Sequence, residues 1–274
     1  MVDMHIHTTF SDGNDDLEKI LEHTKNYDLF SVTDHNNIMS SKLVKADNYV
    51  TGVELSISPL DLGILSNVEL HLLAYNYNPN DKRLNEIIDE FTYYNNLIYL
   101  KILTNIIVKN KLKIDLDKFK NLIDQNVTIT KLHLIKILIE NGYGNEFYET
   151  FNRYVKENLY EGVKHYYFKC SELIDIMKKS GAYLLLAHPY SYGMDNDLDK
   201  LIKKLYDMGI DGIEMDSKHY IKIQEYIKKY NFIYSVGSDY HGKEFNKCNL
   251  IGIDDTLYCE DNQYIKNRLL FNKN

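Results

Sequence analysis

Short apolar segments alternate with polar ones along the first 80 residues. The apolar segments of strand length are residues 2–6, 29–32, 49–57 and 68–75. Between the first two, residues 15–27 carry Leu17, Ile20 and Leu21 at helical spacing, which predicts an amphipathic helix. This order of strand, helix and strand indicates the βα units of an α/β fold.

From residue 81 to about residue 160 the pattern becomes helical throughout. The expected helices are residues 84–108, 115–123, 131–139 and 146–155. We predict an all-helical insertion, residues 81–163, of about three to five helices. No linker rich in Pro, Gly or Ser flanks this block, so we expect it to pack against the rest of the chain.

The βα pattern then returns. The expected helices are residues 170–180, 197–208 and 221–230, and the expected strands are residues 182–187, 210–215 and 232–236. We therefore expect one α/β domain in two parts, residues 1–80 and 164–274, interrupted by the helical insertion.

The composition is that of a globular protein. Of 274 residues, 44% are hydrophobic and 26% are charged. No apolar run reaches the roughly 18 residues of a membrane span, and the N-terminal residues do not have the pattern of a signal peptide. The three cysteines are far apart and form no CxxC, so we expect reduced thiols in a cytoplasmic protein without membrane contact.

The net charge of −8 argues against a structural or nucleic-acid-binding protein that depends on duplex contacts, because such proteins are usually basic. The charge is uneven. Residues 81–165 hold 13 Lys and Arg against 12 Asp and Glu, whereas the rest holds 19 against 28. The acidic excess therefore lies in the α/β segments, where bound cations would neutralise part of it.

Two histidines begin the candidate chemistry. His5 and His7 are one residue apart in an expected strand, so their side chains share a face and can converge on one cation. Asp12 follows in a turn-like Ser-Asp-Gly sequence. Alone, this HxH pattern is equally consistent with chance or with two polar core residues.

Further residues of metal-ligand type recur at or near the C-terminal ends of expected strands: His35, Glu54, His71, His188, Asp239 and His241. With His5 and His7 included, six of the ten histidines fall at such positions. In a closed barrel the C-terminal ends of the strands converge on one face. Imidazole and carboxylate without thiolate suit zinc, manganese or iron.

These motifs resemble the PHP (polymerase and histidinol phosphatase) domain family, in the family's order and over nearly the whole chain. The residues that carry the resemblance are Asp3-Met-His5-Ile-His7-Thr8, Ser11-Asp12-Gly13, Thr33-Asp34-His35-Asn36, Gly52-Val-Glu54, His71, Ala187-His188-Pro189 and Gly237-Ser238-Asp239-Tyr-His241-Gly242. The position of the insertion, together with residues 128–133 and 146–154, is similar to the TrpH-like subgroup of metal-dependent phosphoesterases.

The resemblance implies a distorted (β/α)7 TIM-like barrel with a trinuclear site for two to three divalent cations. The first cation would be held by His5, His7, Glu54 and Asp239. Glu54 would bridge to a second cation on His71 and His188, and the third would be held by Asp12, His35 and His241. A bridging carboxylate brings two cations to the short spacing of two-metal hydrolases.

The implied activity is hydrolysis of small phosphorylated nucleotides by metal-activated hydroxide attack. The substrate would be a nucleoside 3′,5′-bisphosphate that loses its 3′-phosphate, or the 5′ end of a short oligonucleotide. Asp12, Glu54 and His241 would be catalytic, with Asp12 or a nearby histidine protonating the leaving oxygen. The alternatives are a phosphomonoesterase acting on a metabolite such as histidinol phosphate, and a non-catalytic PHP module. The sequence does not indicate the oligomeric state.

Other residues have weaker signals. Asp3 and Asp34 would orient metal-bound imidazoles, although Asp34 would serve equally as a turn or cap residue. Lys131 and His133 take the place of an Arg-Pro-His-like element that contacts phosphate in the subgroup, and their alternative role is a solvated helix start. The remaining substrate-binding candidates are Arg153, Lys164 and His219.

Overall fold

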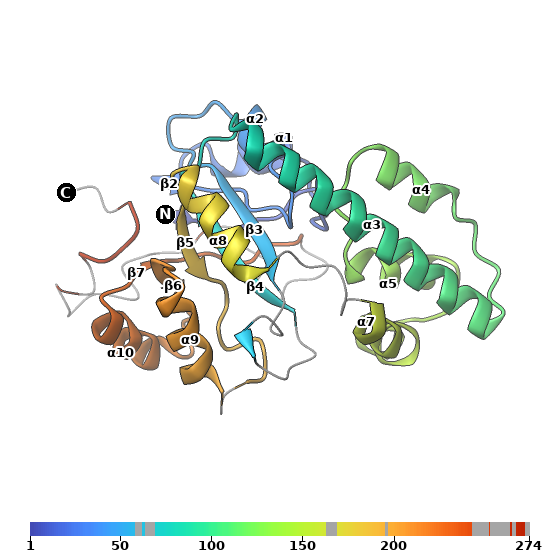
Figure 1. Cartoon of the computed structure of the whole chain (residues 1–274). Coiled ribbons are helices and arrows are strands. Elements are labelled where there is room, and N and C mark those ends of the chain that lie inside the picture. The colour runs from blue at the N-terminus through green and yellow to red at the C-terminus, as the bar shows by residue number, and fades with distance from the viewer. Residues whose placement is uncertain are drawn as a thin grey trace.

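The computed structural model shows a mixed α/β protein whose strands lie beside a group of helices (Figure 1). It describes residues 1–57, 62–63, 69–162, 169–194, 197–242, 252, 264 and 267–271. Within these residues no helix is both long and apolar enough to cross a bilayer.

The strands form two sheets. They are β1 (Val2–Asp3), β2 (Leu29–Phe30), β3 (Gly52–Ile57), β4 (Leu70–Tyr75), β5 (Tyr183–Leu186), β6 (Gly212–Glu214) and β7 (Ile233–Ser235). The first two pair in parallel, and the other five pair in sequence order. β4 runs antiparallel to both β3 and β5, whereas β5, β6 and β7 are parallel.

Isolated contacts join the two sheets at both of their junctions. The His35–Glu54 bridge links the segment after β2 to β3. On the other side, Met4 N donates to Val236 O at 2.9 Å, and Ile6 bridges to Tyr240. The polar segments that follow β1, β2 and β7 are thereby brought to one end of β3.

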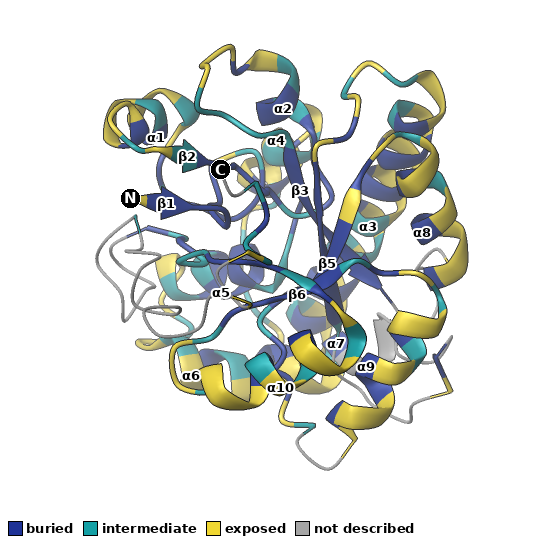
Figure 2. Ribbon diagram, turned by 90° about the vertical axis from the view of Figure 1, so that its left-hand side faces the viewer, coloured by how far each residue is buried: buried dark blue, intermediate teal, exposed yellow. Residues whose placement is uncertain are grey.

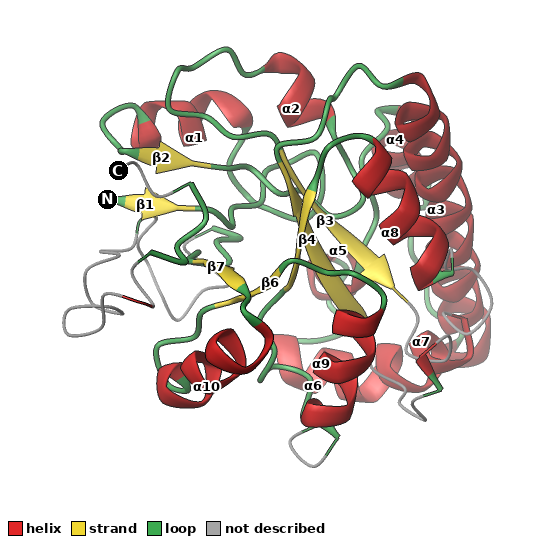
Figure 3. Cartoon of the chain, turned by 60° about the vertical axis from the view of Figure 1, so that its left-hand side comes forward, coloured by secondary structure: helices red, strands yellow, loops and turns green. Residues whose placement is uncertain are grey.

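Five helices cover the strands from outside (Figure 3): α1 (Leu17–Thr24), α2 (Met39–Leu43), α8 (Cys170–Lys179), α9 (Leu198–Asp207) and α10 (Tyr220–Tyr230). All but α2 turn apolar side chains inward and leave their outer faces exposed (Figure 2), whereas the buried residues of α2 are Ser40 and Ser41. In α9 the buried side chains are Leu198, Leu201, Ile202 and Leu205. β4 and most of β5 are buried on both faces, which explains why their sequences are nearly continuous apolar runs.

The remaining helices gather to one side of the strands (Figure 1): α3 (Lys82–Asn110), α4 (Asp117–Asp124), α5 (Lys131–Glu140), α6 (Phe147–Thr150), a π-helical turn η2 (Phe151–Val155) and α7 (Lys156–Gly162). They bury an apolar cluster of their own around Leu103, Phe119 and Leu138. No strand occurs in residues 81–162, as the sequence predicts.

The helical group packs against the α/β part, as expected from the absence of a Pro-, Gly- or Ser-rich linker. Thr92 Oγ1 on α3 donates to Asn36 O at 2.9 Å. Asn37 Nδ2 donates to Asn126 O at 3.1 Å, and Thr128 N donates to Phe10 O at 3.0 Å. These bonds fix residues 126–130 against the loops that follow β1 and β2.

The expected elements agree with the observed ones to within a few residues, with two differences. The five-residue α2 was not expected, because it is too short for a helical period. The helix expected over residues 146–155 is interrupted by η2, which leads directly into α7. The expected domain boundary at residues 163–164, with Lys164, lies outside the described residues, as do Cys248 and Cys259.

Candidate metal centre

His5 and His7 follow β1 and are completely buried. Their Nε2 atoms lie 3.1 Å apart, and each lies 3.3 Å from Asp239 Oδ1. Gly237 precedes Asp239 and has no side chain to keep the two segments apart. A Cβ there would lie 2.3 Å from His5 Cβ. The expected convergence of the HxH pair is thus observed, with a carboxylate between the two rings.

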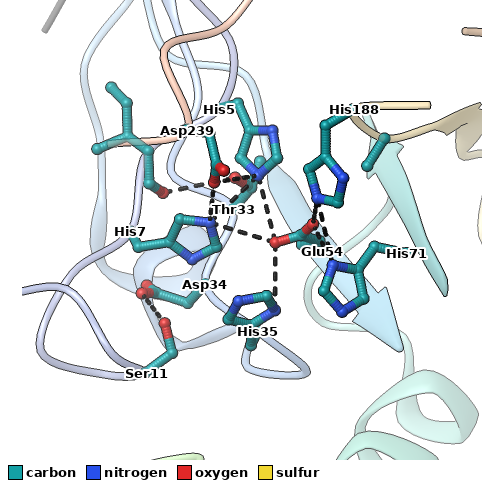
Figure 4. Close-up of polar contacts among 12 residues, drawn as sticks. His5, His7, Ser11, Thr33, Asp34, His35, Glu54, His71, His188 and Asp239 are labelled. Atoms are coloured by element: carbon teal, nitrogen blue, oxygen red, sulfur yellow. Dashed lines mark hydrogen bonds and ion pairs between the residues drawn. The ribbon is translucent and has the colours of Figure 1, made fainter. Parts of the chain in front are cut away.

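Glu54 lies in β3 at the centre of the group, and its two carboxylate oxygens face different imidazoles (Figure 4). Oε2 lies 3.2 Å from the Nε2 atoms of His5 and His7 and 3.1 Å from His35 Nδ1. Oε1 lies 2.8 Å from His71 Nδ1 and 2.9 Å from His188 Nε2. One fully buried carboxylate therefore joins two sets of imidazoles.

His71 reaches this group by a route that the sequence analysis had wrong. It was expected at the C-terminal end of a strand, but it is the second residue of β4. Because β4 is antiparallel, its beginning lies at the same edge as the end of β3, where His71 pairs with Ser56. The reversed strand still brings the imidazole to Glu54.

Two ligand-type residues have unusual backbone conformations. Asp239 has φ of 51° and His188 has φ of 20°, in a region that non-glycine residues rarely adopt. His188 is held by Ser191 Oγ, 2.7 Å from its Nδ1, and by its own N–H, which donates to Glu214 Oε2 at 2.7 Å. Such strain is typical of functional sites, where the surroundings stabilise it.

A further group lies beside His7. Asp12 Oδ1 lies 3.3 Å from His241 Nε2 and 3.9 Å from His7 Nδ1, and Asp12 Oδ2 lies 3.8 Å from His35 Nε2. The His7 and His241 rings stack with their centroids 4.1 Å apart. Thr130 Oγ1, at the start of α5, donates to Asp12 Oδ2 at 2.7 Å.

The donor atoms converge in three groups, each of which is compact enough to surround a cation. The groups are His5, His7, Glu54 and Asp239; His35, Glu54 and His71; and His7, Asp12, His35 and His241. His188 joins the second through Glu54 Oε1. The expected ligand sets thus lie together, with His7 and His35 each placed between two of the groups.

The buried donors suit bound cations better than a hydrogen-bonded core. Within the described part of the chain, four buried atoms of this cluster have no hydrogen-bond partner: His7 Nδ1, Asp12 Oδ1, Glu54 Oε2 and His71 Nε2. Leaving a buried polar atom unpaired costs about 1–3 kcal/mol. Imidazole nitrogens and carboxylate oxygens in this mixture are ligands for zinc, manganese or iron.

The electrostatics of the group favour ionised carboxylates. Burial raises the pKa of Glu54, but His35, His71 and His5 outweigh burial and hold it well below its ordinary value. Burial lowers the pKa of His7, yet Asp239 and Glu54 raise it to about 10. Before cations bind, a proton on His7 therefore offsets part of the negative charge of the carboxylates.

Sequence reasoning missed Glu214, in β6. Its Oε1 lies 2.8 Å from His5 Nδ1, and its Oε2 accepts the N–H of His188. A carboxylate on Nδ1 fixes that proton and turns the Nε2 lone pair toward the cluster. The available signal was weak: Glu214 is one of two acidic residues, with Asp211, in the strand expected over residues 210–215.

Asp3 and Asp34 were expected to orient imidazole rings, and this expectation is wrong, because their hydrogen bonds go to other groups. Asp34 accepts hydrogen bonds from Thr8 N, Thr8 Oγ1, Ser11 Oγ and Ser40 Oγ. Asp3 accepts from Ser238 and from the backbone N–H groups of His5 and Gly252. Both carboxylates therefore organise the loops, which is the alternative that the sequence left open for Asp34.

A cavity of about 980 Å³ opens over the cluster. Asp12, His35, His71, His188, Asp239 and His241 line its metal-ligand end. Lys131 lines it from α5, and Lys218, which the sequence analysis did not single out, lines it from the loop after β6. Lys131 is thus the expected substrate-binding residue that the structure places at the cavity.

Three other candidates lie elsewhere, outside the cavity lining. His133 is buried, and its Nδ1 accepts the Thr130 N–H at 3.1 Å in a capping box. Arg153 is exposed and pairs with Glu149 at 3.4 Å. His219 stacks on Tyr190 at 3.9 Å and contacts Asp216 at 3.0 Å. The capping bond of His133 reflects its place at the third position of α5.

Comparison with characterised proteins gives relatives at low identity. No family model matches the chain. It is 24% identical over 260 residues to a phosphoribosyl 1,2-cyclic phosphate 1,2-diphosphodiesterase from Eggerthella lenta, covering 88% of this chain and 94% of the relative. It is 24% identical over 254 residues to a 5′-3′ exoribonuclease from Haemophilus influenzae, covering 87% and 89%. The corresponding Escherichia coli enzyme is 22% identical over 255 residues, covering 87% and 84%.

Solved structures share the fold. A protein described as a metal-dependent phosphoesterase from Bifidobacterium adolescentis has a TM-score of 0.69 at 20% identity, covering 98% of this chain and 96% of that one. An amidohydrolase from Chromobacterium violaceum has a TM-score of 0.75 at 18% identity, covering 88% and 87%. The chain is therefore similar in sequence to phosphoester hydrolases, and it shares its mixed α/β fold with structures described as a phosphoesterase and an amidohydrolase.

Proposed function

We propose that the protein is a metal-dependent hydrolase of phosphoesters. The observation that carries the proposal is Glu54, whose two oxygens each face a separate set of imidazoles at 2.8–3.2 Å. This is the arrangement of a carboxylate that bridges two cations. Similarity to curated phosphodiesterases and exoribonucleases supports the same reaction class.

We assign three cation positions to the cluster. His5, His7, Glu54 and Asp239 would hold the first, Glu54, His71 and His188 the second, and Asp12, His35 and His241 the third. The compact grouping of these donors supports the assignment. The bridges at both sheet junctions support a distorted seven-stranded barrel around it, with residues 81–163 as the helical insertion.

Bound divalent cations supply activation of water at neutral pH and neutralise negative charge on a phosphoryl group. The protein positions the side chains that would hold the cations. Glu54 is held from both sides and stays ionised, and Glu214 fixes the orientation of His5. Asp12 and His241 line the cavity 3.3 Å apart, where one of them would hold the proton that the leaving oxygen takes.

For the substrate we propose a small phosphorylated nucleotide. The curated relatives are named for a phosphoribosyl cyclic phosphate and for RNA, so phosphorylated ribose is common to them. The cavity is large enough for a nucleotide, and Lys131 brings a positive charge to its wall. Lysine contributes a point charge to phosphate binding, without the two-pronged geometry of arginine.

The test is phosphate release by the protein reconstituted with Mn²⁺. The panel contains adenosine 3′,5′-bisphosphate, 5′-phosphorylated dinucleotides, a phosphoribosyl 1,2-cyclic phosphate and histidinol phosphate. Preference for the bisphosphate or the dinucleotides supports the nucleotide proposal. Preference for histidinol phosphate contradicts it and identifies a metabolite phosphatase. If no member of the panel releases phosphate, the proposal that the protein is a phosphoester hydrolase is contradicted.

Lys131→Ala separates the substrate proposal from the metal centre. We expect it to raise KM for the nucleotide substrates and to leave metal content unchanged, because Lys131 lines the cavity but is not a ligand. Lys101→Ala removes an exposed lysine from the helical group and is the matched control. Equal kinetics for both variants would contradict a substrate contact by Lys131.

A further inference from the structure

A hydrogen bond joins the helical group to the metal centre. Thr130 Oγ1 donates to Asp12 Oδ2 at 2.7 Å. Thr130 belongs to the segment before α5, whereas Asp12 belongs to the loop after β1, 118 residues earlier. A bond from a hydroxyl to a buried carboxylate is short, directional and charge-assisted.

The two oxygens of Asp12 have different surroundings. Oδ2 is occupied by Thr130. Oδ1 is buried, faces His241 and His7, and has no hydrogen-bond partner within the described residues. The bond on Oδ2 thus fixes the rotation of the carboxylate so that the lone pairs of Oδ1 point into the group of imidazoles.

Thr130 is itself held rigidly. Asn96 on α3 accepts the N–H of Ile129 at 2.8 Å and donates to Val127 O at 2.8 Å. Asn95 donates to Ile129 O at 2.8 Å. Thr130 Oγ1 also accepts the N–H of Leu132 as the N-cap of α5. The hydroxyl is therefore fixed on both sides before it meets Asp12.

We propose that Thr130 is a positioning residue for Asp12, and that the helical group in this way completes the third cation position. The inference rests on the proposed function, because it requires a cation at Asp12. Partners of this kind, which contact a ligand but not the metal, change metal affinity by about 10–100-fold when they are removed. We expect an effect of that size on one cation alone.

The test measures Mn²⁺ binding, with isothermal titration for the affinities and mass spectrometry for the number of bound ions. Wild type should bind three cations. Thr130→Val keeps the shape but loses the donor, so it should bind the third cation at least about 10-fold more weakly and the other two as wild type does. Thr130→Ser keeps the hydroxyl and should restore binding. Thr128→Val is the matched control, since Thr128 is buried two residues earlier and contacts Asn37 at 3.5 Å.

A measurement on the unmodified chain covers the case in which Thr130→Val does not fold. Coupling is reciprocal, so filling the third position should slow amide exchange in residues 128–133 as well as in residues 8–14. Three tight cations in Thr130→Val, or unchanged exchange in residues 128–133, would overturn this inference alone. Wild type without a cation at Asp12 would overturn both this inference and the trinuclear centre.

Discussion

His5 Nδ1 lies 2.8 Å from Glu214 Oε1, and both side chains are buried. Glu214 also accepts the N–H of His188, so one carboxylate orients ligands from two segments of the chain. The carboxylate holds the proton on Nδ1 and leaves Nε2 free to face Glu54 and Asp239.

Glu214→Gln should weaken binding of the first cation by about 10–100-fold, because an amide no longer fixes the imidazole proton or strengthens the Nε2 donor. Titration of the metal-depleted variant with Mn²⁺ measures this. Glu225→Gln, an exposed residue on α10, is the control. Equal affinities in the two variants would contradict the orienting role.

Metal binding should release protons. Burial lowers the pKa of His71, but Glu54 and Glu69 outweigh burial and raise it to about 9, and the pKa of His7 is about 10. Both imidazoles are therefore protonated at pH 7.5 in the metal-free protein and must be neutral to coordinate. Burial also lowers the pKa of His5, but Glu214 and Glu54 outweigh burial and hold it well above its ordinary value, so we expect release of on the order of three protons as the cations bind.

Isothermal titration in buffers of different ionisation enthalpy counts these protons. Affinity should also rise with pH from 7 to 9, because fewer protons compete for the nitrogens. A heat of binding that does not depend on the buffer would show that the imidazoles are already neutral, against this prediction.

His133 should make the free energy of unfolding depend on pH below about 6.5. Burial lowers its pKa to about 4, against 6.5 for the free residue. As the pH falls, His133 is therefore protonated in the unfolded chain at a higher pH than in the folded protein. The contribution of neutral His133 to the free energy of unfolding is fully present above pH 6.5 and is lost as the pH falls toward 4. Between pH 7.5 and 5 the loss is about 2 kcal/mol.

Urea unfolding of the metal-free protein at several pH values checks this. His133→Gln can keep the capping-box bond but does not titrate, so its free energy of unfolding should fall less between pH 7.5 and 5. His23→Gln changes an exposed histidine on α1 and should leave the wild-type slope. The same slope in all three proteins would exclude His133 as its source.

Gly237→Ala should disturb the first cation position. The added Cβ would lie 2.3 Å from His5 Cβ and 2.7 Å from His5 N, and a backbone atom cannot move aside cheaply. Overpacking of this kind costs about 1–3 kcal/mol. The thermal midpoint and the Mn²⁺ affinity should both fall, and a variant unchanged in both would contradict the close approach.

Most of the architecture follows from periodicity. The apolar runs and amphipathic stretches predicted every strand and nearly every helix of the described residues, because burial on two faces or on one stripe leaves a clear pattern. The short α2 leaves no such pattern. The direction of β4 was not predicted either, since an antiparallel strand has the same local pattern as a parallel one.

The candidate ligands were expected for a different reason: histidines and carboxylates recur at the ends of expected strands, and their motifs resemble those of the PHP family. Glu214 and Thr130 could not, because each is an ordinary residue in its own segment and gains its role only by contact across the fold. Asp34 shows the reverse case. An orienting role was expected of it, but it accepts four hydrogen bonds, three from the loop after β1 and one from Ser40 in α2.

The most direct measurement compares phosphate release before and after Mn²⁺ is added to metal-depleted protein, with adenosine 3′,5′-bisphosphate as substrate. Depleted wild type should be inactive, and Mn²⁺ should restore release. Glu54→Gln, which removes the bridging charge, should stay at the level of the blank reaction at the same Mn²⁺ concentration. Release that is equally fast without metal, or unchanged in Glu54→Gln, would contradict a metal centre built around Glu54.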